Sequence, residues 1–278
     1  MVTLPIKREI TLAYLISGFV ALIMSVVSVA GILYGSHIYP ASQVSSNTGT
    51  DVLNLFVGLP MLLGSMWFAR RGSLIGLLCW PGALFYILYV YTFYVLGVPF
   101  NILFLPYVVL VTLSAYTTIG LVASIDGEAV RQRLSGKVPA RTTGGLFILI
   151  AILFMTVDVF LVVTTLASRT PVDATTQVSW IADFTIQLPA LLVVGVLLWR
   201  REAFGYVAAP GLLIQGSVLN AGFALVLMLQ AIFAASSINA PFVALVFVIG
   251  AISFIFLVFF VRGAARSQLP ASLGTMES

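Results

Sequence analysis

The feature that most constrains this chain is a series of apolar runs, each close to the length that crosses a lipid bilayer. The first run, residues 10–34, has 25 residues, and a transmembrane helix needs about 20. Charged residues make up 8% of the chain, whereas a soluble domain carries roughly a quarter. Backbone groups in lipid need internal hydrogen-bond partners, and these runs lack the alternation of barrel strands. The pattern therefore predicts an all-α fold, a polytopic transmembrane helical bundle.

Eight spans fit the apolar runs. They are residues 10–34, 52–69, 73–96, 101–125, 146–167, 180–199, 204–234 and 241–261. The first run follows Lys7 and Arg8 as a signal peptide would, but the apolar core of a signal peptide has only roughly 7–15 residues. We therefore expect the first run to be a retained span.

The basic residues test this number of spans, because Lys and Arg concentrate on the cytoplasmic side of membrane proteins. With eight spans, 12 of the 13 basic residues fall on one side, and only Arg169 falls on the other. The twelve are Lys7, Arg8, Arg70, Arg71, Arg131, Arg133, Lys137, Arg141, Arg200, Arg201, Arg262 and Arg266. This distribution predicts that both termini are cytoplasmic. It also accounts for the net charge of +4 without a nucleic-acid partner.

A shift of 129 residues aligns the chain with itself. Nine identities occur over the 26 positions 59–84, where chance gives roughly two or three in so apolar a sequence. They pair Leu59, Pro60, Leu62, Leu63, Arg71, Gly76, Pro81, Gly82 and Leu84 with the residues 129 positions later. The match predicts two parallel four-helix repeats, residues 1–136 and 137–278, the second ending in a short C-terminal tail. Such repeats are related by a pseudo-twofold axis along the membrane normal; the alternative is that Pro and Arg simply recur at helix ends.

Three prolines lie inside predicted spans. Pro60 and Pro189 occupy matching positions in spans two and six, and Pro210 lies near the start of span seven. Proline removes a backbone donor and can leave a carbonyl group without its helical partner, so these positions are candidates for gates or bends. A fixed kink that serves only packing is the alternative.

Asp158 in span five is the clearest functional candidate. It lies roughly 13 Å below the outer end of the span, and no basic residue is available at that depth, so it must be protonated, face water or bind a cation. Asp183 and Gln187 lie four residues apart in span six, and Asn54 is the counterpart of Asp183 in the first half. These residues predict a polar site in the outer half of the membrane. A neutral Asp158 that donates one interhelical hydrogen bond is the alternative.

Span seven has a high polar content, with Gln215, Ser217, Asn220 and Gln230. These side chains predict either a substrate site or hydrogen bonds between helices. Asp51 and Asp173 add negative charge on the outer side, where with Asp158 and Asp183 they would attract cations. For Asp51 we expect a capping role at a helix start, and for Asp173 a solvated position.

Span three is rich in aromatic residues. Tyr86, Tyr89 and Phe93 share one helix face in the outer half of the span. Their position predicts an interfacial aromatic belt. A stacking pocket for a lipid, a quinone or an aromatic solute is the alternative.

Several kinds of chemistry lack the residues that they require. The chain has one histidine, His37, and one cysteine, Cys79, so it cannot hold a haem between two histidines or form an internal disulfide. No predicted span contains a lysine for a retinal Schiff base, and neither metal-ligand spacing nor a phosphate-binding glycine loop occurs. We therefore expect no catalytic residue, no metal and no cofactor.

Four short motifs carry a resemblance to known sequences: residues 81–86 (PGALFY), 99–101 (PFN), 182–184 (ADF) and 198–202 (LWRRE). In these motifs the chain resembles a family of uncharacterised prokaryotic polytopic membrane proteins. The resemblance implies the plasma membrane of a bacterium or archaeon, and it implies no activity.

Three functions are consistent with these observations. A transporter of a small solute or cation is favoured by the repeat, the paired prolines and Asp158. A non-catalytic subunit or assembly factor of a membrane complex is favoured by the lack of reactive residues, and its partner would be another membrane protein. A lipid- or quinone-modifying enzyme rests only on the tyrosines and acids. Because a fold does not determine a function, the site must decide between them.

Overall fold

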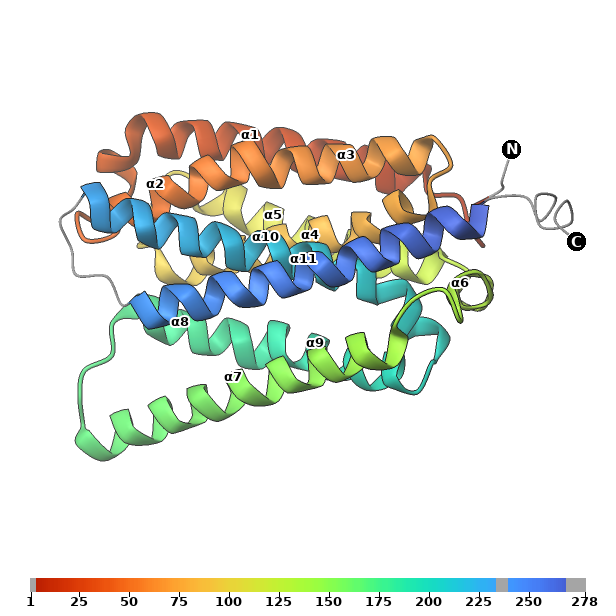
Figure 1. The fold of residues 1–278 in the computed structure, drawn as a ribbon. Helices are drawn as coiled ribbons and strands as arrows, with labels where there is room; N and C mark the ends of the chain where they lie inside the picture. The colour runs from red at the N-terminus through yellow and green to blue at the C-terminus, as the bar shows by residue number, and fades with distance from the viewer. Residues whose placement is uncertain (1–3, 234–239, 269–278) are drawn as a thin grey trace, which may run out of the picture.

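The computed structural model describes residues 4–233 and 240–268, and most of them are helical. The helices run roughly along one common direction (Figure 1). In order they are α1 (Thr11–Ile38), α2 (Val44–Leu53), the π-helical turn η1 (Asn54–Gly58), α3 (Leu59–Arg70), α4 (Leu74–Gly97), α5 (Phe104–Ser124), α6 (Gly127–Leu134), α7 (Ala140–Ser168), α8 (Ala174–Ala182), the π-helical turn η2 (Asp183–Gln187), α9 (Leu188–Trp199), α10 (Ala203–Phe233) and α11 (Ala240–Gln268). Within the described residues, 8 helical stretches are long and apolar enough to cross a membrane. The predicted all-α bundle of eight spans is confirmed, and the chain is an integral membrane protein. The predicted C-terminal tail, residues 269–278, lies outside the described residues.

Spans two and six begin earlier than the sequence predicts. They start at Val44 and Ala174, so residues that we expected in outer loops are helical. Hydroxyl groups in these turns donate to carbonyl groups four residues back, as Thr50 does to Ser46 (2.9 Å). Such bonds satisfy polar side chains inside a helix, so a polar composition does not end it.

The structure departs from the expected role of Asp51 and agrees with that of Asp173. Asp51 lies near the end of α2 and is 1% exposed, so the expected capping role at a helix start is wrong. Asp173, which is exposed as expected, caps α8 by accepting hydrogen bonds from the hydroxyl (2.6 Å) and the backbone N–H (3.0 Å) of Thr176. These hydrogen bonds hold the pKa of Asp173 below its ordinary value.

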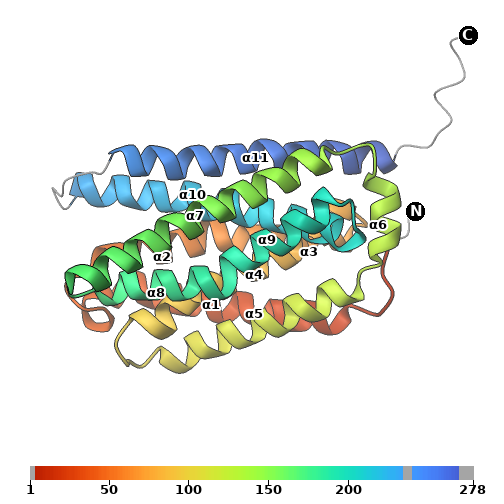
Figure 2. The same ribbon diagram turned by 90° about the horizontal axis from the view of Figure 1, so that it is seen from below.

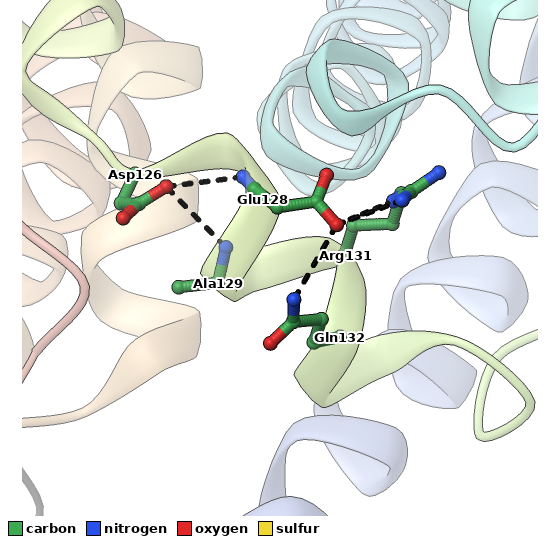
Figure 3. Close-up of polar contacts among 5 residues, drawn as sticks. All are labelled: Asp126, Glu128, Ala129, Arg131 and Gln132. Carbon is green, nitrogen blue, oxygen red and sulfur yellow. Dashed lines mark hydrogen bonds and ion pairs between the residues drawn. The ribbon is translucent and has the colours of Figure 1, made fainter.

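The segment between the two halves contains a short amphipathic helix, α6, where the sequence suggests only a mixed-charge linker. Asp126 caps it by accepting a hydrogen bond from the Glu128 N–H at 3.2 Å. On the exposed side, Glu128 accepts hydrogen bonds from the Arg131 guanidinium (Figure 3), and these bonds hold the pKa of Glu128 below its ordinary value. On the opposite side, Val130 is fully buried. The helix therefore lies on the end of the bundle.

The first and last parts of the described chain lie at the same end of the bundle, here called the basic end. Ile6 forms an antiparallel bridge with Ile125, and Lys7 Nζ lies 3.7 Å from Asp126 Oδ1. Gly263, near the end of α11, packs against the backbone of Lys137. This arrangement agrees with an even number of spans. The side of the membrane on which the basic end lies stays a prediction.

Helix α4 is the central helix. In its most apolar 18-residue window 83% of the residues are buried, compared with 22–44% in the other seven spans. Figure 2 shows α1 and α5 on one side of α4, and α10 and α11 on the other. Because α4 has no face left for lipid, it can be apolar and aromatic all round.

Helices α4 and α10 cross at two glycines, Gly82 and Gly211. A Cβ atom built on Gly82 would overlap the backbone of Gly211, and one built on Gly211 would lie 3.0 Å from the Gly82 nitrogen. The two helices therefore touch backbone to backbone, which only glycine allows. These residues are equivalent under the 129-residue shift, and a contact between equivalent residues is expected at a pseudo-twofold axis.

The helix bounds follow the same shift. The pairs α1 and α7, η1 and η2, α3 and α9, and α4 and α10 each begin 129 residues apart. Duplication of the chain stays a prediction, which these bounds favour.

We expect Gly82→Ala to lower the stability of the folded protein by about 1–3 kcal/mol, because the added methyl group forces two backbones apart. The matched control is Gly120→Ala, because a Cβ atom there meets nothing within 4 Å and Ala is the better helix former. Thermal denaturation in detergent micelles measures both. An unchanged midpoint for Gly82→Ala would contradict the backbone contact.

Candidate functional site

Each half contains one π-helical turn, and a proline is the second residue after that turn. After η1 the Leu59 N–H bonds to the carbonyl of Asn54, and after η2 the Leu188 N–H bonds to the carbonyl of Asp183. Pro60 and Pro189 come next. A proline ring clashes with the carbonyl group four residues before it, and a π-turn widens the helix at that place. A proline thus lies close after each of the two π-turns, and each π-turn begins at a predicted polar candidate.

Three side chains from three helical segments form the candidate site, in the part of the bundle away from the basic end. They are Asp158 of α7, Asp183 of η2 and Tyr89 of α4, here called the carboxylate site. The Tyr89 hydroxyl donates to Asp183 Oδ1 at 2.7 Å, and Asp158 lies within electrostatic range of both residues. Asp158 is 8% exposed, and its Oδ2 atom is buried without a hydrogen-bond partner.

No basic side chain neutralises the carboxylate site. Lys and Arg are absent from residues 72–130, 142–168 and 170–199, which hold the three contributing segments. The two ion pairs that the described residues form, Lys7 with Asp126 and Arg131 with Glu128, both lie at the basic end. Two ionised carboxylates without a counter-charge would be strongly unfavourable in lipid, so at least one of them must hold a proton or contact a bound cation.

Gln187 and Gln215 form a reciprocal pair one turn closer to the membrane centre. Each amide nitrogen donates to the amide oxygen of the other residue, at 3.3 and 3.1 Å. Gln215 is fully buried, and Gln187 belongs to the same π-turn as Asp183. The pair therefore holds α10 against the turn that carries the acid.

Asn54 lies away from the carboxylate site, in a cluster of tyrosines in the first half. It accepts a hydrogen bond from the Tyr86 hydroxyl at 2.9 Å, and its amide points to the Tyr91 hydroxyl at 3.5 Å. The Tyr91 hydroxyl is also 3.2 Å from Ser28 of α1. These contacts tie η1 and α1 to the central helix.

Asp51 completes this tyrosine cluster. Its two carboxylate oxygens accept hydrogen bonds from Tyr39 (2.6 Å) and Tyr94 (3.0 Å). Gly31 makes room for the carboxylate, because a Cβ atom there would overlap Asp51. In contrast to Asp158, this acid has a donor for each oxygen, which is typical of a structural role.

The predicted interfacial belt in span three is wrong. Tyr86, Tyr89, Tyr91 and Tyr94 are at most 8% exposed, and their hydroxyl groups bond to neighbouring helices. The belt prediction fails because α4 lies at the centre of the bundle and not beside lipid. Neither the groove between α7 and α9 nor the groove between α3 and α4 is lined by these tyrosines or by the two acids.

The remaining candidates lie apart from the carboxylate site. Asn220 donates to the Gly216 carbonyl of its own helix at 2.8 Å, and Ser217 donates to Leu213 at 2.6 Å. Pro210 lies in the second turn of α10, which is one helix from Ala203 to Phe233. The side chain of Gln230 lies outside the described residues. Within the described part of the chain, no three His, Cys, Asp or Glu residues are placed to hold a metal ion.

Sequence reasoning missed Tyr89 as a partner of Asp183, and Tyr39 as a partner of Asp51. The available signal was the even spread of aromatic and small residues around residues 74–97, which is typical of a helix buried on all sides. In a buried helix, tyrosine hydroxyls need partners on neighbouring spans. The acids of those spans are the natural acceptors.

Comparisons of the chain with protein families, with curated proteins and with solved structures find no match. The chain's fold class and its membrane character therefore rest on the sequence and the structure described above.

We expect Tyr39→Phe to destabilise the folded protein by about 1–3 kcal/mol, because it leaves a buried carboxylate oxygen of Asp51 without its donor. Tyr34→Phe is the matched control, since Tyr34 lies in the last part of α1, five residues before Tyr39, and is 60% exposed. Unfolding in mixed micelles with increasing SDS measures the difference. Equal stability of the two variants would refute the structural role of the Tyr39 hydrogen bond.

Proposed function

We propose that this protein is a proton- or cation-coupled transporter of a small solute or ion, in the plasma membrane of a prokaryote. The observation that carries the proposal is Asp158, whose Oδ2 atom is buried at mid-span without a partner. Ionisable groups at this depth in a membrane commonly mark ion pathways and proton relays.

The pairing of Asp158 with Asp183 supplies a means of coupling. The two carboxylates repel each other when both are ionised, so binding of a proton or cation relieves the repulsion. A solute that contacts the same acids changes the affinity for that proton or cation, and the reverse holds by linkage. Tyr89 and the Gln187–Gln215 pair add neutral hydrogen-bonding groups beside the acids.

The arrangement of α7 supplies a means of access. Helix α7 packs chiefly against α9 and runs obliquely along the bundle (Figures 1 and 2). A movement of α7 would expose Asp158 while the crossing of α4 and α10 stays intact. In this proposal the two halves are parallel repeats around that crossing, and Pro189 with η2 forms the weak point of the mobile half.

Asp158→Asn is expected to reduce cation-driven flux by about tenfold or more, because it removes the charge that attracts the ion. The purified protein is reconstituted in liposomes that contain a pH-sensitive dye. Proton flux is then followed after an imposed pH gradient, and radioactive sodium uptake after an imposed sodium gradient.

Asp173→Asn is the matched control, because Asp173 is exposed at a helix start and lies outside the spans. It should leave both fluxes unchanged. Unchanged fluxes in Asp158→Asn would contradict the transport role of Asp158. Equal losses of flux in Asp158→Asn and Asp173→Asn would contradict it as well.

A non-catalytic subunit of a membrane complex is the second candidate, favoured by the outer face of α7. Large apolar side chains on this helix are exposed, among them Phe160 (65%) and Leu166 (73%), and a partner helix could cover them in place of lipid. Purification from native membranes tests this function. A stoichiometric partner that is lost in Phe160→Ala, and retained in Phe19→Ala on α1, would favour the complex over an independent transporter.

A further inference from the structure

An open apolar groove of about 350 Å³ lies between α7 and α9 near the basic end. Gly145, Ile148, Leu149 and Ile152 of α7 form one wall, and Val196, Trp199 and Arg200 form the other. The α7 residues follow the spacing of one helix face. Leu149, Ile152 and Trp199 are each more than half exposed, so the groove opens toward the surrounding lipid.

Glycines determine the shape of this groove. A Cβ atom on Gly144 would come within 2.7 Å of the Gly195 carbonyl oxygen, so α7 and α9 are in close contact there. The neighbouring Gly145 lies under the Trp199 ring, which a Cβ atom would approach to 2.6 Å. Because the indole ring lies directly against Gly145, the hollow of the groove runs beside this contact, at the level where spans meet water.

Two arginines mark the mouth of the groove. Arg200 lines it directly, and Arg141 lies one turn before Gly145 on the same face of α7. Among the described residues, neither arginine takes part in an ion pair. The acidic residue nearest in sequence, Glu202, forms an ion pair with neither of them. The mouth therefore carries positive charge, while the rest of the groove is apolar.

We propose that this groove binds an anionic phospholipid of the bilayer, with one acyl chain in the hollow and the phosphate group at Arg200 and Arg141. An apolar groove with two arginines at its mouth matches this ligand in two ways. Arginine binds phosphate through paired donors, and basic pockets between spans bind anionic head groups. The exposed Trp199 ring lies where aromatic residues meet head groups. The site is independent of the carboxylate site, which lies in the outer half of the bundle.

Native mass spectrometry of the delipidated protein tests the proposal, with phosphatidylglycerol and phosphatidylcholine added back separately. The unaltered protein should bind phosphatidylglycerol more tightly. The double variant Arg141→Gln, Arg200→Gln should bind phosphatidylglycerol about 25-fold more weakly, since each basic side chain raises the affinity for an anionic surface roughly fivefold. The control is Arg262→Gln with Arg266→Gln, which removes two exposed charges from the same end of the bundle.

A second pair of variants tests the apolar part of the groove. Ile152→Trp fills the hollow and should also weaken phosphatidylglycerol binding, whereas Leu153→Trp, on the neighbouring face that does not line the groove, should not. Thermal melting confirms that both variants are folded. The proposal would be overturned if the unaltered protein bound the two lipids equally tightly, or if a variant and its control weakened phosphatidylglycerol binding equally. A dimer that buries the groove would also overturn it. None of these outcomes depends on transport.

Discussion

The backbone contact between α4 and α10 at Gly82 and Gly211 is the constraint on which the rest of the structure depends. In lipid, apolar side chains gain little by leaving the acyl chains around them, so spans associate through close packing and hydrogen bonds. Two facing glycines give the closest packing available, because no side chain separates the helices. Once α4 is fixed to α10, its other faces receive spans from both halves. Its tyrosines then reach acceptors in each half, such as Asp51 in the first and Asp183 in the second.

The two halves differ in the polar residues that they place around α4 and α10. At equivalent positions, the first half has Asn54, which is neutral and lies between Tyr86 and Tyr91, and the second has Asp183, which receives a hydrogen bond from Tyr89. The acid of the first half, Asp51, has a phenol for each oxygen. The second half keeps a buried acid, Asp158, with an unpaired oxygen. Satisfied polar networks make a structure rigid, whereas an unsatisfied buried acid is a strained feature that a ligand or proton can relieve.

Hydropathy and the positions of arginine were sufficient to predict the number of spans, because both depend only on how deep a residue lies. Which face of a span a residue occupies depends on the neighbouring helices, and the sequence does not contain that directly. Asp158 and Asp183 were therefore recognised separately, each by its depth, while their proximity and the link through Tyr89 became visible only in the structure. The prediction of an aromatic belt failed because it, too, depends on the face that a residue occupies. Tyr86 and Tyr89 lie at the depth of a belt, but the face that they occupy is covered by other spans.

The π-turns add a further reason why the faces could not be predicted. A π-turn inserts one residue into a helix, and each residue of an α-helix turns by about 100°. Extending the helix from Pro189 toward the outer end with regular geometry therefore assigns the residues before η2 to the wrong face. The same turn occurs before Pro60 at the equivalent position, and in both halves it begins at a polar residue, Asn54 or Asp183. The π-turn thus acts on the site indirectly: it determines which way the outer part of its span faces, and in the second half that orientation brings Asp183 to Tyr89.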